Sequence, residues 1–212
     1  MRASIIPRAA LCALATLALA GCASVGEDEC LAMDWRTVGY EDGATGQGIE
    51  RFTSRRQACA KHGVAPDLDA YRSGREEGLL EFCQPANGFR VGARGRGYAG
   101  ACPEYLAPAF SDAYQAGRDL WRLESRVHDA IRGIADRRAE VERIDAGLVG
   151  TSFELVGEAK TPEERAQALL DTRSLAERRG RLLAEIDTLE RALPGYEAEL
   201  AAYRDTLAYS GY

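Results

Sequence analysis

The stretch that decides the fold runs from residue 120 to residue 148 and reads LWRLESRVHDAIRGIADRRAEVERIDAGL. Its apolar residues recur at alternating steps of three and four, with Arg137 as the one interruption. These residues are Leu120, Leu123, Val127, Ala130, Ile134, Val141, Ile144 and Leu148. The spacing is the heptad pattern of a coiled coil, in which one apolar stripe packs against a partner helix. A long helix with one buried edge is therefore expected here.

A second stripe begins after Thr161-Pro162-Glu163-Glu164. This tetrapeptide is typical of a helix start, because Thr161 can cap the helix, Pro162 fits its first turn and Glu164 can close a capping box. Pro194 interrupts the stripe, so we expect a kink or a brief break there, with the stripe resuming on the same face. The residues of the stripe are Leu175, Leu182, Ile186, Leu189, Leu193, Tyr196, Leu200, Tyr203 and Leu207.

The chain changes composition near Pro103. Residues 30–103 are dense in glycine and cysteine, whereas residues 104–212 are rich in Ala, Leu, Glu and Arg. We therefore expect a mainly α protein, with a small glycine-rich head domain stapled by disulfides, followed by a long antiparallel coiled-coil hairpin. The hairpin helices are expected at about 104–149 and 162–208, and each would be roughly 70 Å long. A homodimer that pairs two hairpins is the alternative use of the apolar stripes.

The N-terminus has the features of an export signal. Arg2 and Arg8 precede an apolar run at residues 9–20, which is too short for a membrane-spanning helix of roughly 20 residues. The segment Leu19-Ala20-Gly21-Cys22 resembles the lipobox of bacterial lipoproteins. This resemblance implies a signal peptide at residues 1–21, a lipid on Cys22 and a tether at residues 22–29.

Ala23 follows the lipobox cysteine, and the sorting rule for such lipoproteins then implies the outer membrane, on its periplasmic side. Removal of residues 1–21 takes away two arginines and no acid, so the formal net charge moves from −6 to −8. This charge disfavours nucleic-acid binding. The expected partners are the membrane, through the lipid, and an envelope protein or an anionic glycan.

Four cysteines remain for the mature domain: Cys30, Cys59, Cys83 and Cys102. An even number in an exported protein favours two disulfides, and three pairings are open. We favour Cys30 with Cys59 and Cys83 with Cys102, because both are local. The alternative is a zinc site in which His62 joins Cys59, Cys83 and Cys102. An oxidising compartment argues against that alternative, so no metal or cofactor is expected.

Two glycine motifs occur in the head segment, GYEDG at residues 39–43 and GREEG at residues 74–78, and a degenerate copy at residues 114–119 leads into the long helix. Glycines four residues apart lie on one face of a helix and leave a groove that lets a second backbone approach. Gly46 is expected to extend the first groove. Adjacent acids point about 100° apart on a helix, so the two acids of one motif cannot hold one ion. We expect the acids to keep the outer surfaces hydrated and the glycines to pack two helices together.

A catalytic alternative uses one acid from each glycine helix. Asp42 and Glu77 would form a carboxylate pair across the packed helices, which suits acid and base catalysis on a glycan. The sequence contains no GxSxG, HExxH or phosphate-loop motif. We therefore assign no catalytic residue and favour a non-enzymatic role.

An arginine-bearing segment, FRVGARGRGY at residues 89–98, is the second candidate for binding chemistry. It carries Arg90, Arg94 and Arg96, and it contains no acid. A glycine-rich loop with arginines can hold phosphate or carboxylate groups, so these three residues are candidate anion ligands. A hydrated loop held between two disulfide cysteines is the alternative.

The cysteine, glycine and aromatic positions agree together with a known pattern. The pattern is C-x-x-x-D-W-x-x-x-G-x-x-D-G from Cys30, C-x-x-H-G-V-x-P-D from Cys59, Y-x-x-G-x-x-x-G-L, C-x-P-x-N-G-F from Cys83 and G-Y-x-G-x-C-P ending at Pro103. From Cys30 to Phe110 the chain resembles a family of bacterial lipoproteins classified as a domain of unknown function, family 2799. The resemblance brings no assigned activity.

These observations lead to one functional hypothesis and one alternative. The hypothesis is an outer-membrane lipoprotein with a structural or interaction role in the cell envelope. The alternative is a glycan- or anion-directed binding module or hydrolase that uses the head domain.

Overall fold

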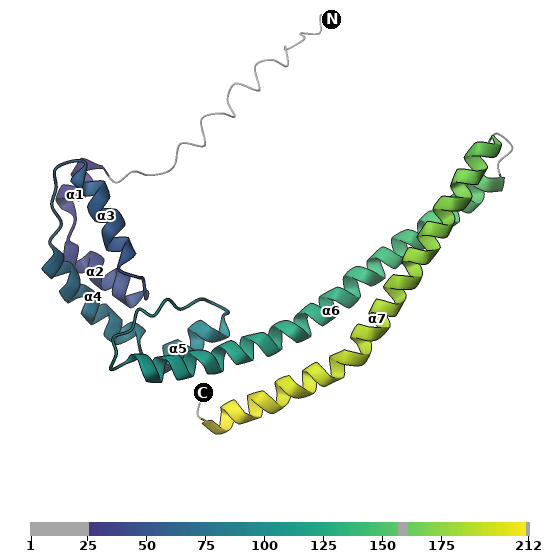
Figure 1. Ribbon diagram of the computed structural model, residues 1–212. Coiled ribbons are helices and arrows are strands. Elements are labelled where there is room, and N and C mark those ends of the chain that lie inside the picture. The colour runs from purple at the N-terminus through teal and green to yellow at the C-terminus, as the bar shows by residue number, and fades with distance from the viewer. Residues whose placement is uncertain (1–25, 157–160, 211–212) are drawn as a thin grey trace, which may run out of the picture. The chain divides into compact units, whose positions relative to one another are not determined.

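The computed structural model describes residues 26–156 and 161–210, and within them every regular element is a helix (Figure 1). The helices are α1 (Glu27–Ala32), α2 (Trp35–Ala44), α3 (Glu50–Ala60), α4 (Leu68–Phe82), α5 (Pro85–Ala93), α6 (Ala107–Val156) and α7 (Pro162–Ser210). The expected mainly α fold is therefore confirmed. The predicted signal peptide and Cys22 lie outside the described residues. No helix in the described part of the chain has the length and apolarity needed to cross a membrane.

The described chain divides into two compact units. The first comprises residues 26–83 and 99–103, and the second comprises residues 84–98 and 104–210. One boundary falls between Pro103 and Glu104, where the composition changes, but residues 84–98 also lie in the second unit, because α5 packs with α6.

The first unit is a cluster of short helices with well-marked starts. The Asp34 carboxylate accepts from the backbone N–H of Arg36 and caps α2, and the Asp67 carboxylate accepts from the N–H of Ala70 and caps α4. Such caps satisfy backbone donors that a helix start leaves open. The core of the unit consists of Cys30, Trp35, Phe52, Cys59 and Tyr71.

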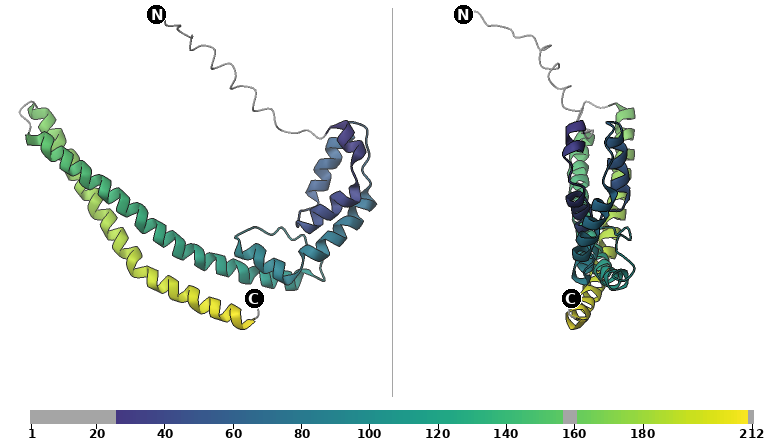
Figure 2. Two further views of the ribbon diagram at one scale, coloured as in Figure 1. Left: turned by 180° about the vertical axis from the view of Figure 1, so that it is seen from behind. Right: turned by 90° about the vertical axis from the view of Figure 1, so that its left-hand side faces the viewer.

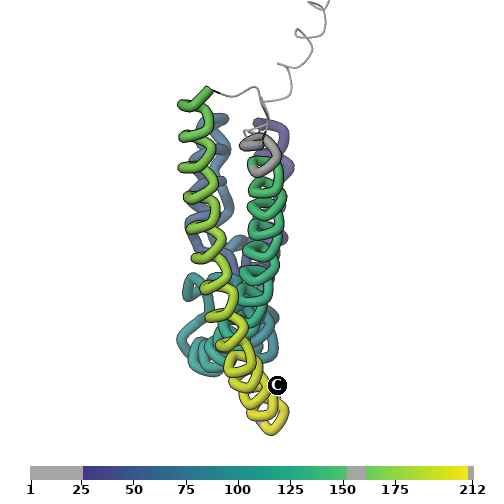
Figure 3. Tube along the Cα trace, turned by 90° about the vertical axis from the view of Figure 1, so that its right-hand side faces the viewer, coloured from purple at the N-terminus to yellow at the C-terminus, as the bar shows by residue number. Residues whose placement is uncertain are grey.

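The second unit contains the hairpin of α6 and α7, whose two long helices run side by side (Figures 1, 2 and 3). The predicted stripes form its seam. The buried seam residues are Ala130, Ile134, Val141 and Ile144 of α6 and Ala168, Ile186, Leu200 and Leu207 of α7. The fold therefore follows the heptad pattern, and α6 continues seven residues past the predicted end at 149.

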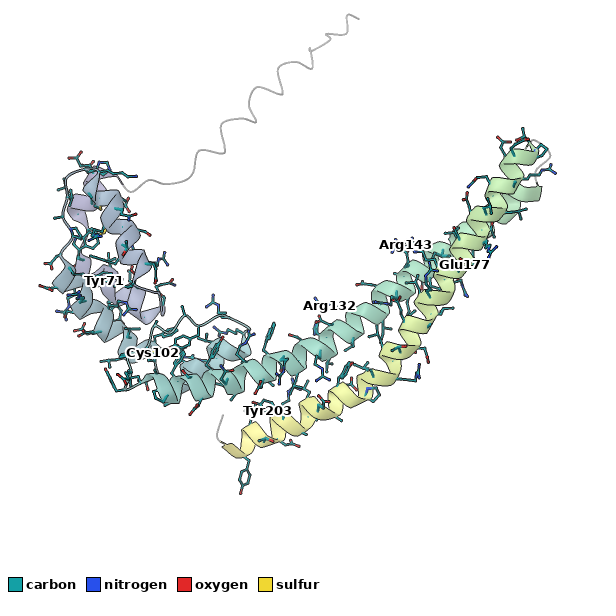
Figure 4. The ribbon with its side chains drawn as sticks, viewed as in Figure 1. Tyr71, Cys102, Arg132, Arg143, Glu177 and Tyr203 are labelled. Carbon is teal, nitrogen blue, oxygen red and sulfur yellow. A yellow bond between two sulfur atoms is a disulfide. The ribbon has the colours of Figure 1, made fainter. Side chains whose placement is uncertain are left out.

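Ion pairs between α6 and α7 fix the register of the hairpin. They are Arg126–Glu199, Arg137–Glu185, Arg138–Glu190, Arg178–Glu140, Arg179–Asp145 and Arg204–Glu124, each between 2.5 and 2.7 Å. Arg137, the interruption of the α6 stripe, lies in the seam and pairs with Glu185. The Tyr203 hydroxyl also donates to the Ala116 carbonyl at 2.9 Å (Figure 4). Each exposed pair contributes little alone, but a slip of either helix would break all of them together.

Two features were predicted for α7: a capping box at its start and an interruption at Pro194. The capping box is confirmed, because the Thr161 N–H donates to Glu164 Oε2 at 2.8 Å and the Glu164 N–H donates to Thr161 Oγ1 at 3.3 Å. We expected a kink or a brief break near Pro194, and the break does not occur, since α7 is continuous from Pro162 to Ser210; the helix is bent along its length (Figure 1). The apolar face is continuous as well, with Leu200 and Leu207 buried beyond the proline.

Candidate functional site: a repeated glycine-packed helix pair

Two helices of the first unit approach each other closely at the glycine motifs. A Cβ atom added to Gly39 would lie 2.0 Å from the Tyr71 carbonyl oxygen, and one added to Gly74 would lie 1.9 Å from that of Arg36. Added Cβ atoms at Gly43 and Gly78 would likewise lie 2.3 and 2.2 Å from backbone oxygens of the facing helix. No side chain fits at these positions, so the packing role predicted for the glycines is the one the structure has. Backbones this close also permit weak Cα–H···O contacts between helices.

The two helices of this pair, α2 and α4, run parallel. Gly39 faces Tyr71 and Gly43 faces Arg75, so both chains advance by four residues in the same direction. α3 returns the chain between them and supplies Phe52, whose ring lies 4.6 Å from that of the fully buried Tyr71.

A second pair of the same kind lies in the second unit, between α5 and α6. A Cβ atom at Gly88 would lie 2.5 Å from the Phe110 carbonyl oxygen, and one at Gly92 would lie 2.1 Å from that of Tyr114. On the facing helix α6, a Cβ atom added to Gly117 would lie 2.2 Å from the Phe89 carbonyl oxygen. These helices are also parallel, because Gly88 to Gly92 and Phe110 to Tyr114 advance together.

The sequences of the two pairs match position by position. α2 and its end read GYEDGATG from Gly39, and α5 and its end read GFRVGARG from Gly88. α4 reads YRSGREEGLLEF from Tyr71, and α6 reads FSDAYQAGRDLW from Phe110. The aromatic residue at each end of these longer stretches is therefore kept, as is the small residue at every close approach. We call residues 30–82 the first copy and residues 83–121 the second copy.

The packing around the pairs is repeated too. Phe52 covers Tyr71 in the first copy, and Tyr98 covers Phe110 in the second, both with ring centroids 4.6 Å apart. Each first helix ends in a Schellman motif, with a left-handed glycine: Gly46 at φ 67° and Gly95 at φ 69°. Gly46 therefore lies beyond the end of α2 and does not extend the helical groove as expected.

One disulfide closes each copy. Cys30 of α1, which precedes α2, is bonded to Cys59 in the last turn of α3, and Cys83, which precedes α5, is bonded to Cys102 in the segment between α5 and α6. These are the two local pairings that the sequence favours. Because the four cysteines form two disulfides, Cys59, Cys83 and Cys102 do not provide the thiolates that the zinc alternative requires. The described residues contain no cluster with the ligands for a metal ion.

Asp42 is buried in the first copy, contrary to the expectation that it keeps an outer surface hydrated. Its carboxylate pairs with Arg55 and accepts a hydrogen bond from the Tyr71 hydroxyl at 3.0 Å, and Arg51 lies 3.9 Å away. Burial and the neighbouring carboxylate of Asp42 raise the pKa of Tyr71 to about 12, so the phenol stays a neutral donor. The equivalent positions in the second copy are Val91 and Phe110, which have neither group.

The carboxylate pair proposed for catalysis is not formed. Glu77 is about half exposed and pairs with Arg36 on the outside of α2, whereas the Asp42 side chain is 3% exposed. Both carboxylates are engaged by arginine, and no hydrogen bond or ion pair joins one to the other. The Asp42 carboxylate is therefore buried, and a glycan cannot reach it.

The arginine segment is also different from the predicted loop. Arg90 lies within α5, Arg94 is its C-cap, and only Arg96 follows the helix. All three side chains are exposed. The Arg90 guanidinium donates to Asn87 Oδ1 at 3.3 Å.

The fold and this packing define a class: a helical protein with two disulfides and one glycine-packed parallel helix pair in each of its two units, in which the last helix of the second pair extends into a hairpin. Residues 34–119 match the family model described as "Protein of unknown function (DUF2799)", and this part of the chain belongs to that family. The match begins at the N-cap of α2 and ends just after Gly117, so it spans both glycine-packed pairs. Neither the curated proteins nor the solved structures contain a match.

Proposed function

We propose that this protein is a bacterial outer-membrane lipoprotein with a non-enzymatic interaction role in the cell envelope. Support comes from the signal-like residues 1–21, the lipobox ending at Cys22 and the two disulfides, which are stable in an oxidising compartment. In this proposal the lipid on Cys22 holds the chain on the periplasmic face of the membrane.

The observation that carries the interaction role is the exposed apolar surface near the turn of the hairpin. Val149 of α6 is 58% exposed, and Leu169 and Leu170 of α7 are 59% and 62% exposed. The antiparallel register brings the end of α6 and the start of α7 to the same end of the hairpin. Apolar side chains grouped at one end of a charged hairpin favour contact with another protein.

The hydrolase alternative has less support. Asp42 is engaged by Arg55 and Tyr71, and Glu77 by Arg36, so neither carboxylate is placed to transfer a proton to a substrate.

Lipidation is tested by labelling cells with a fatty-acid analogue. The wild-type protein should carry the label and sediment with outer membranes, and Cys22→Ser should lose both properties. A Cys22→Ser protein that stays fully membrane-bound would contradict the anchor.

The role of the hairpin is tested by shortening it without changing its register. Deletion of residues 134–147 from α6 and 178–191 from α7 removes two heptads from each helix and brings the ends about 21 Å closer. A photo-crosslinker at Leu170 should form a defined adduct with an envelope protein in the full-length chain and lose it in the shortened one. A crosslinker at exposed Arg72 is the control, and identical adducts from both positions would contradict a role for the hairpin end.

A further inference from the structure

The end of α5 carries positive charges that the equivalent helix end in the first copy lacks. Glu41, Thr45 and Gln47 of the first copy correspond to Arg90, Arg94 and Arg96 of the second. α2 has no basic residue in its last turn, yet it ends in the same Schellman motif. The arginines are therefore not needed to close this helix end.

The backbone that carries these arginines is held firmly. The Arg96 N–H donates to the Val91 carbonyl at 3.1 Å, and the Tyr114 hydroxyl donates to the Arg96 carbonyl at 3.1 Å. The Arg118 guanidinium donates to the Gly95 carbonyl at 3.0 Å, a bond with no counterpart in the first copy, where Leu79 holds the equivalent position. α6 thus fixes the arginine-bearing turn through two side chains.

The charges of the three arginines are not neutralised within the described residues. Their side chains enter no ion pair there, and residues 82–103 contain no acid. Arg90 and Arg94 are four residues apart on one helical face, where like charges are unfavourable. In a chain with net charge −6, these exposed cations form a local positive group that an external anion can neutralise.

We propose that Arg90, Arg94 and Arg96 form a binding site for phosphate groups. Arginine binds phosphate through paired N–H donors, and a phosphate monoester carries close to two negative charges at neutral pH, so it can neutralise more than one guanidinium. The pinned turn reduces the conformational entropy lost on binding. This site does not depend on the lipid anchor or on the hairpin partner.

The test uses the full-length chain with Cys22→Ser, so that lipidation plays no part. Pyrophosphate is titrated calorimetrically at low salt, and sedimentation is measured with phosphatidylcholine vesicles with and without phosphatidylglycerol. Arg94→Gln/Arg96→Gln should weaken pyrophosphate binding at least tenfold. Binding to anionic vesicles should fall about thirtyfold if lipid head groups are the source of phosphate.

The matched control is Arg132→Gln/Arg143→Gln, which removes the same charge from two exposed arginines of α6 that pair with Asp129 and Glu140 (Figure 4). This control should bind within twofold of the parent. Pyrophosphate binding without vesicle binding would support the site and identify a soluble phosphate ester as its source. No binding by the parent, or equal losses in both double variants, would overturn the proposal.

Discussion

At the scale of single residues, the main contrast is between Asp42 with Tyr71 and their equivalents Val91 and Phe110. The two residues are joined by a buried hydrogen bond in the first copy, whereas their equivalents in the second copy are apolar, and both copies form the same kind of helix pair. The fold therefore does not need the polar pair. A buried carboxylate is tolerated in the first copy because Arg55 and the Tyr71 hydroxyl satisfy it, and removal of one partner would leave the other uncompensated.

The raised pKa of Tyr71 predicts a pH dependence of stability. The folded pKa of about 12 lies above the ordinary value of 10. The stabilisation is therefore fully present below pH 10 and is lost as the pH rises from 10 towards 12, by up to about 3 kcal/mol. The measurement is urea unfolding of the wild type and Tyr71→Phe at several pH values. If the free energy of unfolding fell equally with pH in the two proteins between pH 10 and 12, the environment described for Tyr71 would be contradicted.

At the scale of elements, α7 shows how tertiary packing overrides a local helix breaker. Pro194 has no N–H to donate to the carbonyl one turn earlier, but seam residues on both sides of it remain buried against α6. The heptad seam and the interhelical ion pairs keep the helix continuous through a position that is unfavourable by itself.

Pro194→Ala should therefore stabilise the hairpin, because it restores the missing hydrogen bond and the helix geometry is already present. The expected gain is about 1–3 kcal/mol in the free energy of unfolding, measured by denaturant titration. A lower stability would mean that the proline shapes a bend that the seam requires. Ala192→Gly, nearby on α7, is the control and should destabilise the hairpin.

The hairpin was predictable from sequence because heptads and a capping box are local patterns. α5 is not predictable as a helix from local sequence, because glycine at positions 88 and 92 lowers helix propensity, whereas in the folded chain both glycines pack against α6. The burial of Asp42 depends on Arg55, thirteen residues away, which spacing on α2 does not reveal. The signal that was present, and that identifies the second pair, is the match between GYEDGATG and GFRVGARG.

At the scale of the whole chain, the protein is a repeated unit with a hairpin added to its last helix. Each copy has one disulfide, one pair of parallel helices and glycine or alanine at every close approach. The family match covers both glycine-packed helix pairs and ends within the first part of α6, at residue 119. The two copies should therefore respond alike to substitutions at equivalent glycines.

The most direct test compares Gly→Ala at three helical glycines. Alanine at Gly43 would place its Cβ 2.3 Å from the Arg75 carbonyl oxygen, and alanine at Gly92 would place it 2.1 Å from that of Tyr114, whereas Gly180 of α7 has open space around it. Denaturant unfolding should show Gly43→Ala and Gly92→Ala each destabilised by about 1–3 kcal/mol, and Gly180→Ala stabilised by about 0.5–1 kcal/mol. Stabilisation of Gly43→Ala and Gly92→Ala to the same extent as Gly180→Ala would contradict the close packing of both helix pairs.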